Sequence, residues 1–208
     1  MAARQSNPEN KERFQRAIAA IDAANNADPN LLDDGGAARP AALVYSERMT
    51  AVLADLYPNA SELLCLAARA QHIRRWTIPR SSYPMDRQGY LQWRNELKRF
   101  HAGLAGKIME KCGYDSAEIG RVQFLLRKES LKRDAESQAL EDAACIVFLK
   151  YYAEEFAAKH SDEKLITILR KTLVKMSGIA RKKAIVLPLP ERLRTLLGAA
   201  LAADHAGP

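Results

Sequence analysis

The chain has 208 residues, 48% of them hydrophobic, which allows a buried core and excludes an intrinsically disordered chain. Its 32 Lys and Arg against 25 Asp and Glu give a formal net charge of +7, which favours anionic partners: a nucleotide, an RNA or an anionic small molecule. The three cysteines are scattered without a C-x-x-C pair, which excludes a disulfide framework and a cysteine zinc site and suits a reducing compartment.

Apolar residues at helical spacing, bounded by prolines, glycines and capping residues, predict a succession of helices. The first spans 10–24, and a second runs over 40–57, starting at a proline. Ser61 is expected to cap a third helix that continues to about Trp76. The segment 77–88 contains two prolines and is therefore excluded from regular helix.

The second half of the sequence continues the same pattern. A helix over 89–111 ends at the glycine of Cys112-Gly113-Tyr114, and the next begins at Asp115 or Ser116 and runs to about 128. The longest helix is predicted over 136–159. It is followed by a helix over 161–176 and, after a Pro-x-Pro break, by a terminal helix that ends near Ala203.

Alternation of apolar and polar residues never persists, so we expect no strand. The chain is therefore predicted to be one all-α domain over 1–208, with an ordered core over 10–203 and a frayed tail over 204–208. The N-terminus has no apolar signal segment and no apolar run approaches a membrane span. We accordingly expect a cytoplasmic protein with no membrane partner.

Four of the apolar helices carry ionisable groups at positions expected to be buried. These groups are Glu47, Arg48, Arg69, His72, His101, Glu141 and Asp142. An unpaired buried charge costs several kcal/mol, so these groups must meet one another, a metal or a ligand. One interpretation is a closed network in which Arg48 and Arg69 neutralise the adjacent acids of 141–142. The other is a site between helices, where His72, His101 and Asp142 hold a divalent metal or serve as acid and base.

A basic and aromatic segment follows His72. Its members are Arg74, Arg75, Trp76, Arg80, Tyr83, Arg87, Tyr90, Trp93 and Arg94. Guanidinium groups bind phosphate through paired hydrogen bonds, and aromatic rings stack on bases or on arginine. The pattern predicts a phosphate-binding segment over a pocket, and the alternative is that the arginines stack on surface aromatics to hold the loop. Four lysines at 171, 175, 182 and 183 resemble a solvated face that could extend an electrostatic track.

Several motifs together resemble those of the family called domain of unknown function 4202. They are IDAAN (21–25), LAARAQHIRRWTIPRSSYP (66–84), GYLQWR (89–94), FHA (100–102), GY (113–114) and LEDAACIVFL (140–149). The resemblance covers nearly the whole chain and implies no established activity.

A more distant likeness is to the HD metal-dependent phosphohydrolases, whose order and spacing are followed by VYSERM (44–49), LLCLAARAQHIRR, His101, GY and LEDAA. It implies an orthogonal helical bundle with a metal-binding His-Asp pair. Here Tyr45 occupies the position of the first histidine and Gln71-His72 that of the pair, while Asp142 matches the distal acid. A metal shell would have to be rebuilt from Glu47, His72, His101 and Asp142, or be lost.

The leading hypothesis is an HD-like enzyme, a metal-dependent hydrolase of a phosphorylated or nucleotide-like substrate. In it His72, His101 and Asp142 would bind a divalent metal or, with Glu47, perform acid–base chemistry. The residues expected to bind phosphate are Arg48, Arg69, Arg75, Arg80, Arg87, Arg94, Trp76 and Tyr83. The competing hypothesis is a non-catalytic module that binds RNA or a nucleotide through 74–94 and the C-terminal lysines.

Overall fold

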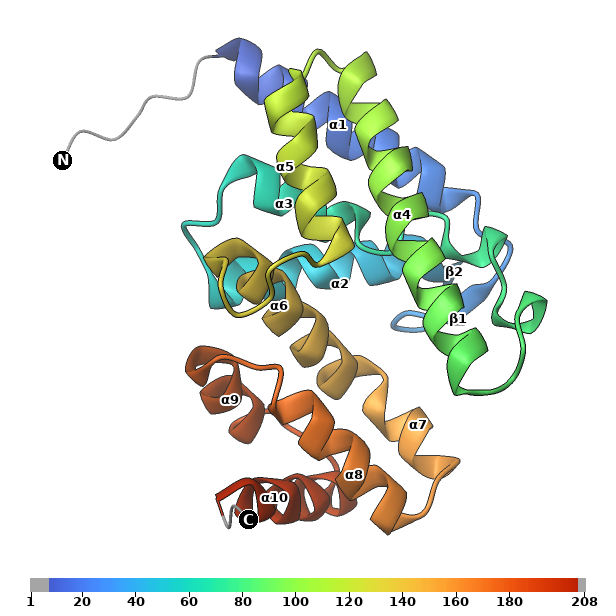
Figure 1. Ribbon diagram of the computed structural model, residues 1–208, viewed down its shortest axis with the longest axis vertical. Coiled ribbons are helices and arrows are strands. Elements are labelled where there is room, and N and C mark those ends of the chain that lie inside the picture. Colours follow the sequence, from blue (N-terminus) through green and yellow to red (C-terminus); the bar gives the residue numbers. More distant parts are fainter. Residues whose placement is uncertain (1–7, 206–208) are drawn as a thin grey trace, which may run out of the picture. The chain divides into compact units, whose positions relative to one another are not determined.

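A computed structural model describes residues 8–205, with side chains to residue 202, and its backbone divides into two compact units (Figure 1). Unit 1 comprises Met1–Ala51 and Asn59–Ser130, and unit 2 comprises Val52–Pro58 and Leu131–Pro208. The described chain is predominantly helical, so the all-α class is confirmed. That the two units form one domain stays a prediction.

Unit 1 contains five helices and a hairpin among its described residues. They are α1 (Pro8–Asn26), β1 (Leu31–Asp33), β2 (Ala38–Pro40), α2 (Ala41–Leu56, of which the last residues belong to unit 2), α3 (Glu62–Ala70), α4 (Arg87–Lys111) and α5 (Ser116–Arg127). Two short 3-10 helices, η1 (Arg75–Thr77) and η2 (Arg80–Ser82), lie between α3 and α4.

The core of unit 1 forms where α4 packs along α5, α3 packs against α5, and α1 covers α3 and α4 (Figure 1). Ala17 and Ile21 of α1, Leu66 of α3, Met109 of α4 and Leu125 of α5 are all fully or almost fully buried. A buried side chain of the size of leucine stabilises the fold by roughly 1.5–3 kcal/mol, so such contacts fix the helices that position the site.

Cap residues placed most helix ends in unit 1 as predicted. Ser61 accepts a hydrogen bond from the Leu64 amide at 3.1 Å, and Asp115 forms a capping box with Glu118. Gly113, with φ 88°, follows the end of α4 and adopts the left-handed conformation that favours glycine.

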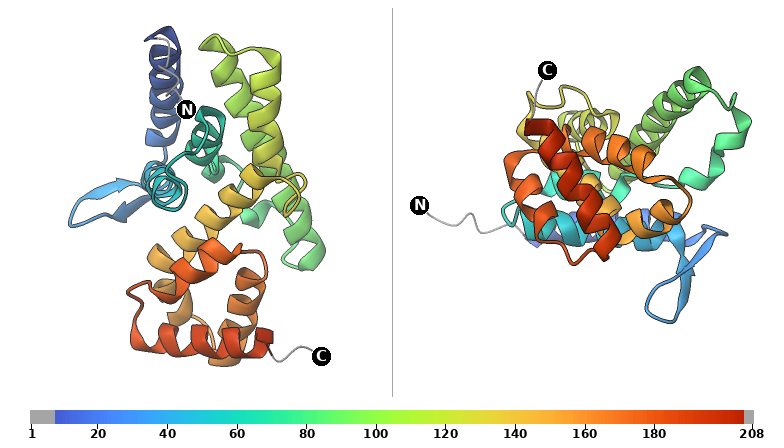
Figure 2. Two further views of the ribbon diagram at one scale, coloured as in Figure 1. Left: turned by 90° about the vertical axis from the view of Figure 1, so that its left-hand side faces the viewer. Right: turned by 90° about the horizontal axis from the view of Figure 1, so that it is seen from below.

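The expectation that the chain has no strand was wrong. β1 and β2 form an antiparallel hairpin, drawn as an arm that extends from the helices of unit 1 (Figure 2, left). Gly35 and Gly36 adopt φ values of 71° and 92° in the turn, and Asp33 accepts a hydrogen bond from the Gly36 amide at 2.7 Å. Strands of only three residues are too short to show an alternating pattern, which is why the sequence did not reveal them.

Unit 2 contains the end of α2, together with α6 (Ala135–Tyr151), α7 (Ala153–Ala158), α8 (Asp162–Leu173), α9 (Gly178–Ile185) and α10 (Glu191–His205). Helix α8 packs against α10, and α6 packs against α7 and α9. Leu140, Ile146 and Leu173 are almost completely buried in its core.

Three predictions for unit 2 were wrong in detail. The helix expected over 136–159 is interrupted at Tyr152, whose φ and ψ of −126° and −16° leave the α region, so α4 is the longest of the described helices. Helix α9 was not predicted. The terminal helix continues to His205, past the expected start of a frayed tail, and residues 206–208 lie outside the described residues.

Candidate anion site in unit 1

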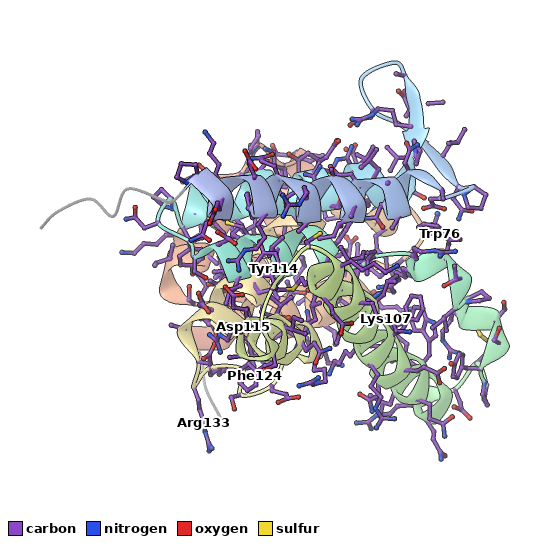
Figure 3. All side chains as sticks on the ribbon, turned by 90° about the horizontal axis from the view of Figure 1, so that it is seen from above. Trp76, Lys107, Tyr114, Asp115, Phe124 and Arg133 are labelled. Carbon is purple, nitrogen blue, oxygen red and sulfur yellow. The ribbon has the colours of Figure 1, made fainter. Side chains whose placement is uncertain are left out.

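The turn after α3 positions the candidate site. Helix α3 ends at Ala70, so the prediction of a helix to Trp76 was wrong, and His72 and Trp76 do not share a helical face with Arg69. Arg74 adopts φ 49° and its amide donates to Oδ1 of the buried Asn25 at 3.1 Å. This hydrogen bond to Asn25 of α1 thereby holds the turn, and the segment with Trp76 continues as a separate connection to α4 (Figure 3).

His72 lies in this turn, stacked on an aromatic ring of α2. The ring centroids of His72 and Tyr45 are 4.3 Å apart with an interplanar angle of 17°. Arg75 Nη1 lies 2.9 Å from His72 Nε2, and because a guanidinium can only donate, Nε2 must be an acceptor. Desolvation, followed by the charge of Arg75, holds the pKa of His72 well below its ordinary value, so the ring is neutral.

His101 is a second neutral histidine, on α4. It is almost completely buried, and its ring centroid lies 5.8 Å from that of His72. Its Nδ1 lies 2.9 Å from the carbonyl oxygen of Ile73, to which it must donate. Burial lowers the pKa of His101 to about 4. The buried Nε2 therefore carries a lone pair, and it has no hydrogen-bond partner among the described residues.

Arg75 brings a permanent positive charge into contact with His72. Its guanidinium lies over the Trp93 ring at 4.7 Å from the centroid, and the described residues include no carboxylate paired with it. Desolvation lowers the pKa of Arg75, and the charge of Arg94 lowers it further. The charges of Lys128 and Arg94 also lower the pKa of His72, so the charged side chains that act on this ring are positive.

This cluster, formed by Tyr45, His72, Arg75, Trp93 and His101, is named the Arg75 cluster below. A desolvated guanidinium without an acid partner is costly unless an anion neutralises it. The cluster therefore offers one fixed cation, one unused buried acceptor and two aromatic walls, a combination suited to an anion that also carries a proton donor.

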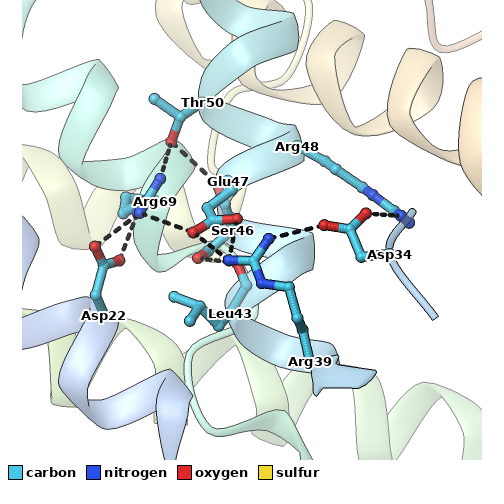
Figure 4. A network of polar contacts seen from close by, with 9 residues as sticks. All are labelled: Asp22, Asp34, Arg39, Leu43, Ser46, Glu47, Arg48, Thr50 and Arg69. Atoms are coloured by element: carbon cyan, nitrogen blue, oxygen red, sulfur yellow. Dashed lines mark hydrogen bonds and ion pairs between the residues drawn. The ribbon is translucent and has the colours of Figure 1, made fainter. Parts of the chain in front are cut away.

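Arg69 and Glu47, predicted to be site residues, form ion pairs elsewhere in unit 1 (Figure 4). Arg69 Nε and Nη2 donate to the two carboxylate oxygens of Asp22 on α1 at 2.6 and 2.7 Å, and Nη1 lies 3.4 Å from the Thr50 hydroxyl. Glu47 lies 4.0 Å from Arg69 Nη2. These contacts join α1, α2 and α3.

Arg48 pairs with the hairpin rather than with a ligand (Figure 4). Its Nη2 lies 2.9 Å from Asp34, which also accepts from Arg39 at 2.8 Å. Arg39 Nη2 in turn donates to both oxygens of Glu47 at 2.9 Å. The closed network expected as one alternative therefore exists for Glu47, Arg48 and Arg69. The acids of this network are Asp22, Asp34 and Glu47. They are not Glu141 and Asp142, as that alternative supposed.

The remaining residues of the basic segment divide between loop structure and surface. Arg80 donates to the carbonyl oxygens of Tyr83 at 3.0 Å and Pro84 at 2.6 Å, and so holds the loop before α4. The hydroxyl of Tyr83 is hydrogen-bonded to Glu96, and desolvation raises its pKa.

Trp76 is half-buried, with the Arg74 guanidinium 6.0 Å from its ring centroid. Arg94 Nη1 lies 3.2 Å from the Tyr90 hydroxyl. Arg87 is exposed in the first turn of α4 and makes no ion pair within residues 8–205. Arg87 is thus an exposed cation and Arg94 a half-buried one, on the side of α4 that also carries the exposed Tyr90.

Asp142, predicted to join the histidines, belongs to unit 2. Its Oδ2 accepts from the Tyr57 hydroxyl at 2.5 Å, and its Oδ1 accepts from Gln138 Nε2 at 2.9 Å and from the Ser177 amide at 2.8 Å. Burial, followed by the bond to Asp142, raises the pKa of Tyr57 to about 12. Both carboxylate oxygens are therefore occupied within unit 2.

The predicted donor set does not fit a divalent metal. The described residues contain no group of three or more His, Cys, Asp or Glu side chains arranged to hold one. His72 Nε2 faces a guanidinium, and the Asp142 oxygens are occupied by donors. These contacts give no support to metal-dependent chemistry, which stays a prediction from the sequence.

Two residues that act on the site, Tyr45 as a member of the Arg75 cluster and Lys128 through its charge, escaped the sequence interpretation. Tyr45 was noted only as a departure from the HD pattern, although its ring is the one that stacks on His72. Lys128 was not singled out. It ends α5 with φ 57°, and neither spacing nor composition distinguishes it from other lysines at helix ends.

These features define a helical protein whose first unit gathers an arginine, two neutral histidines and aromatic rings. Residues 15–197 match the model of the family described as Domain of unknown function (DUF4202), and the chain belongs to this family. No curated protein and no solved structure matches the chain. The likeness to the HD phosphohydrolases stays a prediction from the sequence. None of the helices in residues 8–205 combines the length and apolar character needed to cross a membrane.

Proposed function

We propose that unit 1 binds a phosphate-bearing small molecule, of the nucleotide or phosphomonoester class, at the Arg75 cluster. The observation that carries the proposal is the desolvated guanidinium of Arg75, which has no carboxylate partner in the described structure and contacts a neutral histidine. Phosphate oxygens accept two hydrogen bonds from an arginine, and such charge-assisted bonds are about twice as strong as neutral ones.

The histidines add a second requirement for the ligand. His101 Nε2 carries a lone pair without a partner among the described residues, so a ligand that fits must donate a hydrogen bond to it, from a monoprotonated phosphate or a hydroxyl. A dianion would instead draw a proton from solvent onto this nitrogen. If the ligand is turned over, His101 is the group of the cluster able to accept a proton from water or a hydroxyl, and we propose it as the general base.

The alternative function is binding of single-stranded RNA on the outer side of 74–94. The observation that favours it is the exposure of Arg74, Arg87 and Tyr90 beside a half-buried Trp76, since bases stack on aromatic faces while arginines contact phosphates. Its affinity would fall steeply with salt and would depend on Arg74 and Trp76.

Calorimetric titration with inorganic phosphate, AMP and a short oligouridylate distinguishes these functions. We expect AMP to bind the wild type and Arg75→Met to lower its affinity at least tenfold. The matched control, Arg87→Met, removes an exposed arginine of the same segment and should leave AMP binding unchanged. Equal binding of AMP by wild type and Arg75→Met would refute the site. Binding of the oligouridylate alone, lost on substitution of Arg74, would favour the RNA-binding module.

A further inference from the structure

Unit 2 carries a concentration of positive charge that the Arg75 cluster does not explain. Residues 164–190 contain seven Lys and Arg and no Asp or Glu. The positive charge of this segment alone therefore equals the net charge of the whole chain, which is +7. Within the described residues Lys183 pairs with Asp55 at 2.7 Å and Lys175 lies 3.6 Å from Glu141. Arg170, Lys171 and Lys182 are exposed and pair with no described carboxylate.

Aliphatic side chains are exposed in the same segment. The exposed fractions are 46% for Val174, 54% for Ile179, 57% for Ile185 and 73% for Val186. Few other large apolar residues of the described chain are as exposed, and none of those others lies in unit 2. Exposed apolar side chains mark an interaction site where they lie together on one surface.

The exposed residues share one side of α9 and the turn that follows it. At 100° per residue, Ile179, Lys182 and Val186 are neighbours, spaced i, i+3 and i+7. Ala180, Ala184 and Leu187 fall on the opposite side, and all three are buried. Helix α9 therefore presents lysine and aliphatic side chains together, a surface named the α9 face, formed by Ile179, Lys182, Ile185 and Val186.

The composition of the segment distinguishes between possible occupants. A second copy of the same surface would be repelled by its charge. No Phe, Tyr or Trp lies in 164–190 to stack on bases, and phosphate contacts alone would leave the aliphatic side chains in water. Lysine is depleted in the buried parts of protein interfaces. An anionic phospholipid surface accepts both kinds of side chain, because lysines attract its headgroups while aliphatic groups enter the acyl boundary.

We propose that the α9 face adsorbs unit 2 onto an anionic phospholipid surface. Such adsorption needs no membrane-spanning helix, because only the outward side of the helix enters the interface. Lys171 and Arg170, at the end of α8, add positive charge next to the turn that leads into α9. The inference revises the sequence-based expectation of no membrane partner and is independent of the ligand proposed for unit 1.

Co-sedimentation of the full chain with vesicles tests the proposal. We expect the chain to bind vesicles of phosphatidylcholine that contain about a third phosphatidylglycerol, and this binding should weaken as the salt concentration rises. Vesicles of phosphatidylcholine alone should not bind the chain. Lys171→Gln with Lys182→Gln should weaken binding roughly thirtyfold, at about 1 kcal/mol for each lysine. Lys107→Gln with Lys111→Gln, which removes two exposed lysines of α4 in unit 1 (Lys107 is labelled in Figure 3), is the charge-matched control and should change little.

A second pair of variants tests the apolar contribution. Ile179→Ser with Val186→Ser keeps every charge and should reduce vesicle binding at least tenfold, whereas Leu31→Ser, which removes another exposed aliphatic side chain, should not. Unchanged circular dichroism and melting temperature would establish that these surface variants fold. The proposal is overturned if the wild type does not bind anionic vesicles, or if the variant with Ile179→Ser and Val186→Ser binds them as well as the wild type. It is also overturned if the variant with Lys171→Gln and Lys182→Gln loses binding to RNA but retains binding to vesicles.

Discussion

Arg75 Nη1 lies 2.9 Å from His72 Nε2, and this contact determines the protonation of the histidine. A guanidinium has five N–H donors and no acceptor, so the ring nitrogen that it contacts must carry a lone pair. His72 is therefore the tautomer protonated on Nδ1, and the positive charge beside it opposes a second proton. The cluster holds one charge on arginine and none on histidine.

The first prediction concerns the titration of His72. Replacing Arg75 with Met removes an adjacent positive charge and should raise the pKa of His72, although desolvation, the larger cause of its low pKa, remains. Nitrogen chemical shifts of the imidazole ring, followed against pH, report both tautomer and pKa. Arg87→Met is the control and should leave the titration unchanged. A ring protonated on Nε2 in the wild type would contradict the assignment.

The second prediction is a loss of stability in acid that depends on His101. Its pKa is about 4 in the folded chain and about 6.5 when unfolded, so the unfolded chain binds the proton more readily. The stability contributed by the neutral ring is complete above pH 6.5 and is lost as the pH falls toward 4, by about 3 kcal/mol at most.

Urea unfolding at pH 7 and pH 4.5 measures this loss. In His101→Asn the side-chain amide can still donate to the Ile73 carbonyl but does not titrate, so the variant should lose much of the difference in unfolding free energy between the two pH values. His72, whose pKa is also lowered, should account for a further part of it. An equal pH dependence in wild type and His101→Asn would exclude His101 as a source.

The sequence predicted most helices because their signals are local. Ser61, Asp115 and Gly113 act on adjacent backbone groups, so spacing alone reveals where helices begin and end. The early end of α3 depends instead on Asn25, which accepts from the Arg74 amide across a large separation in sequence. No local pattern shows such a contact.

The same distinction explains the outcome for the candidate site. Burial of polar groups was a sound reason to expect that they find partners, and Arg69, Glu47 and Asp142 all do. Which partners they find depends on tertiary contacts such as the one between Arg69 and Asp22. The basic and aromatic segment contained Arg75 and Trp93, but nothing in the spacing separated Arg75 from its neighbours.

A third prediction concerns the ion network of Figure 4. Arg69→Met removes the paired donors to Asp22 and should destabilise the fold by about 2–3 kcal/mol, because a half-buried carboxylate is left without its partner. The double variant Asp22→Asn with Arg69→Met should recover part of that loss. Thermal unfolding of both single variants and the double variant gives the coupling free energy. A coupling near zero would show that the pair does not stabilise unit 1.

The fourth prediction concerns unit 2. Asp142→Asn replaces an oxygen that accepts from Tyr57 or from Gln138 and Ser177 with an amide that donates, and should cost about 2–3 kcal/mol of stability. It should also lower the pKa of Tyr57 from about 12, since the negative charge that opposes its ionisation is removed. Absorbance near the tyrosinate maximum, followed with pH, measures the change. Tyr57→Phe identifies the signal.

The last prediction uses two glycines of the same helix. A Cβ on Gly89 would lie 2.2 Å from the Pro84 carbonyl oxygen, a backbone atom that must shift to make room. Gly89→Ala should therefore displace the loop that Arg80 holds and destabilise unit 1. A Cβ on Gly103 meets nothing within 4 Å, so Gly103→Ala should stabilise α4 by roughly 0.5–1 kcal/mol, because alanine loses less backbone entropy in a helix. Melting temperatures should shift in opposite directions for the two variants, and a shift in the same direction would contradict the close approach of Pro84 to α4.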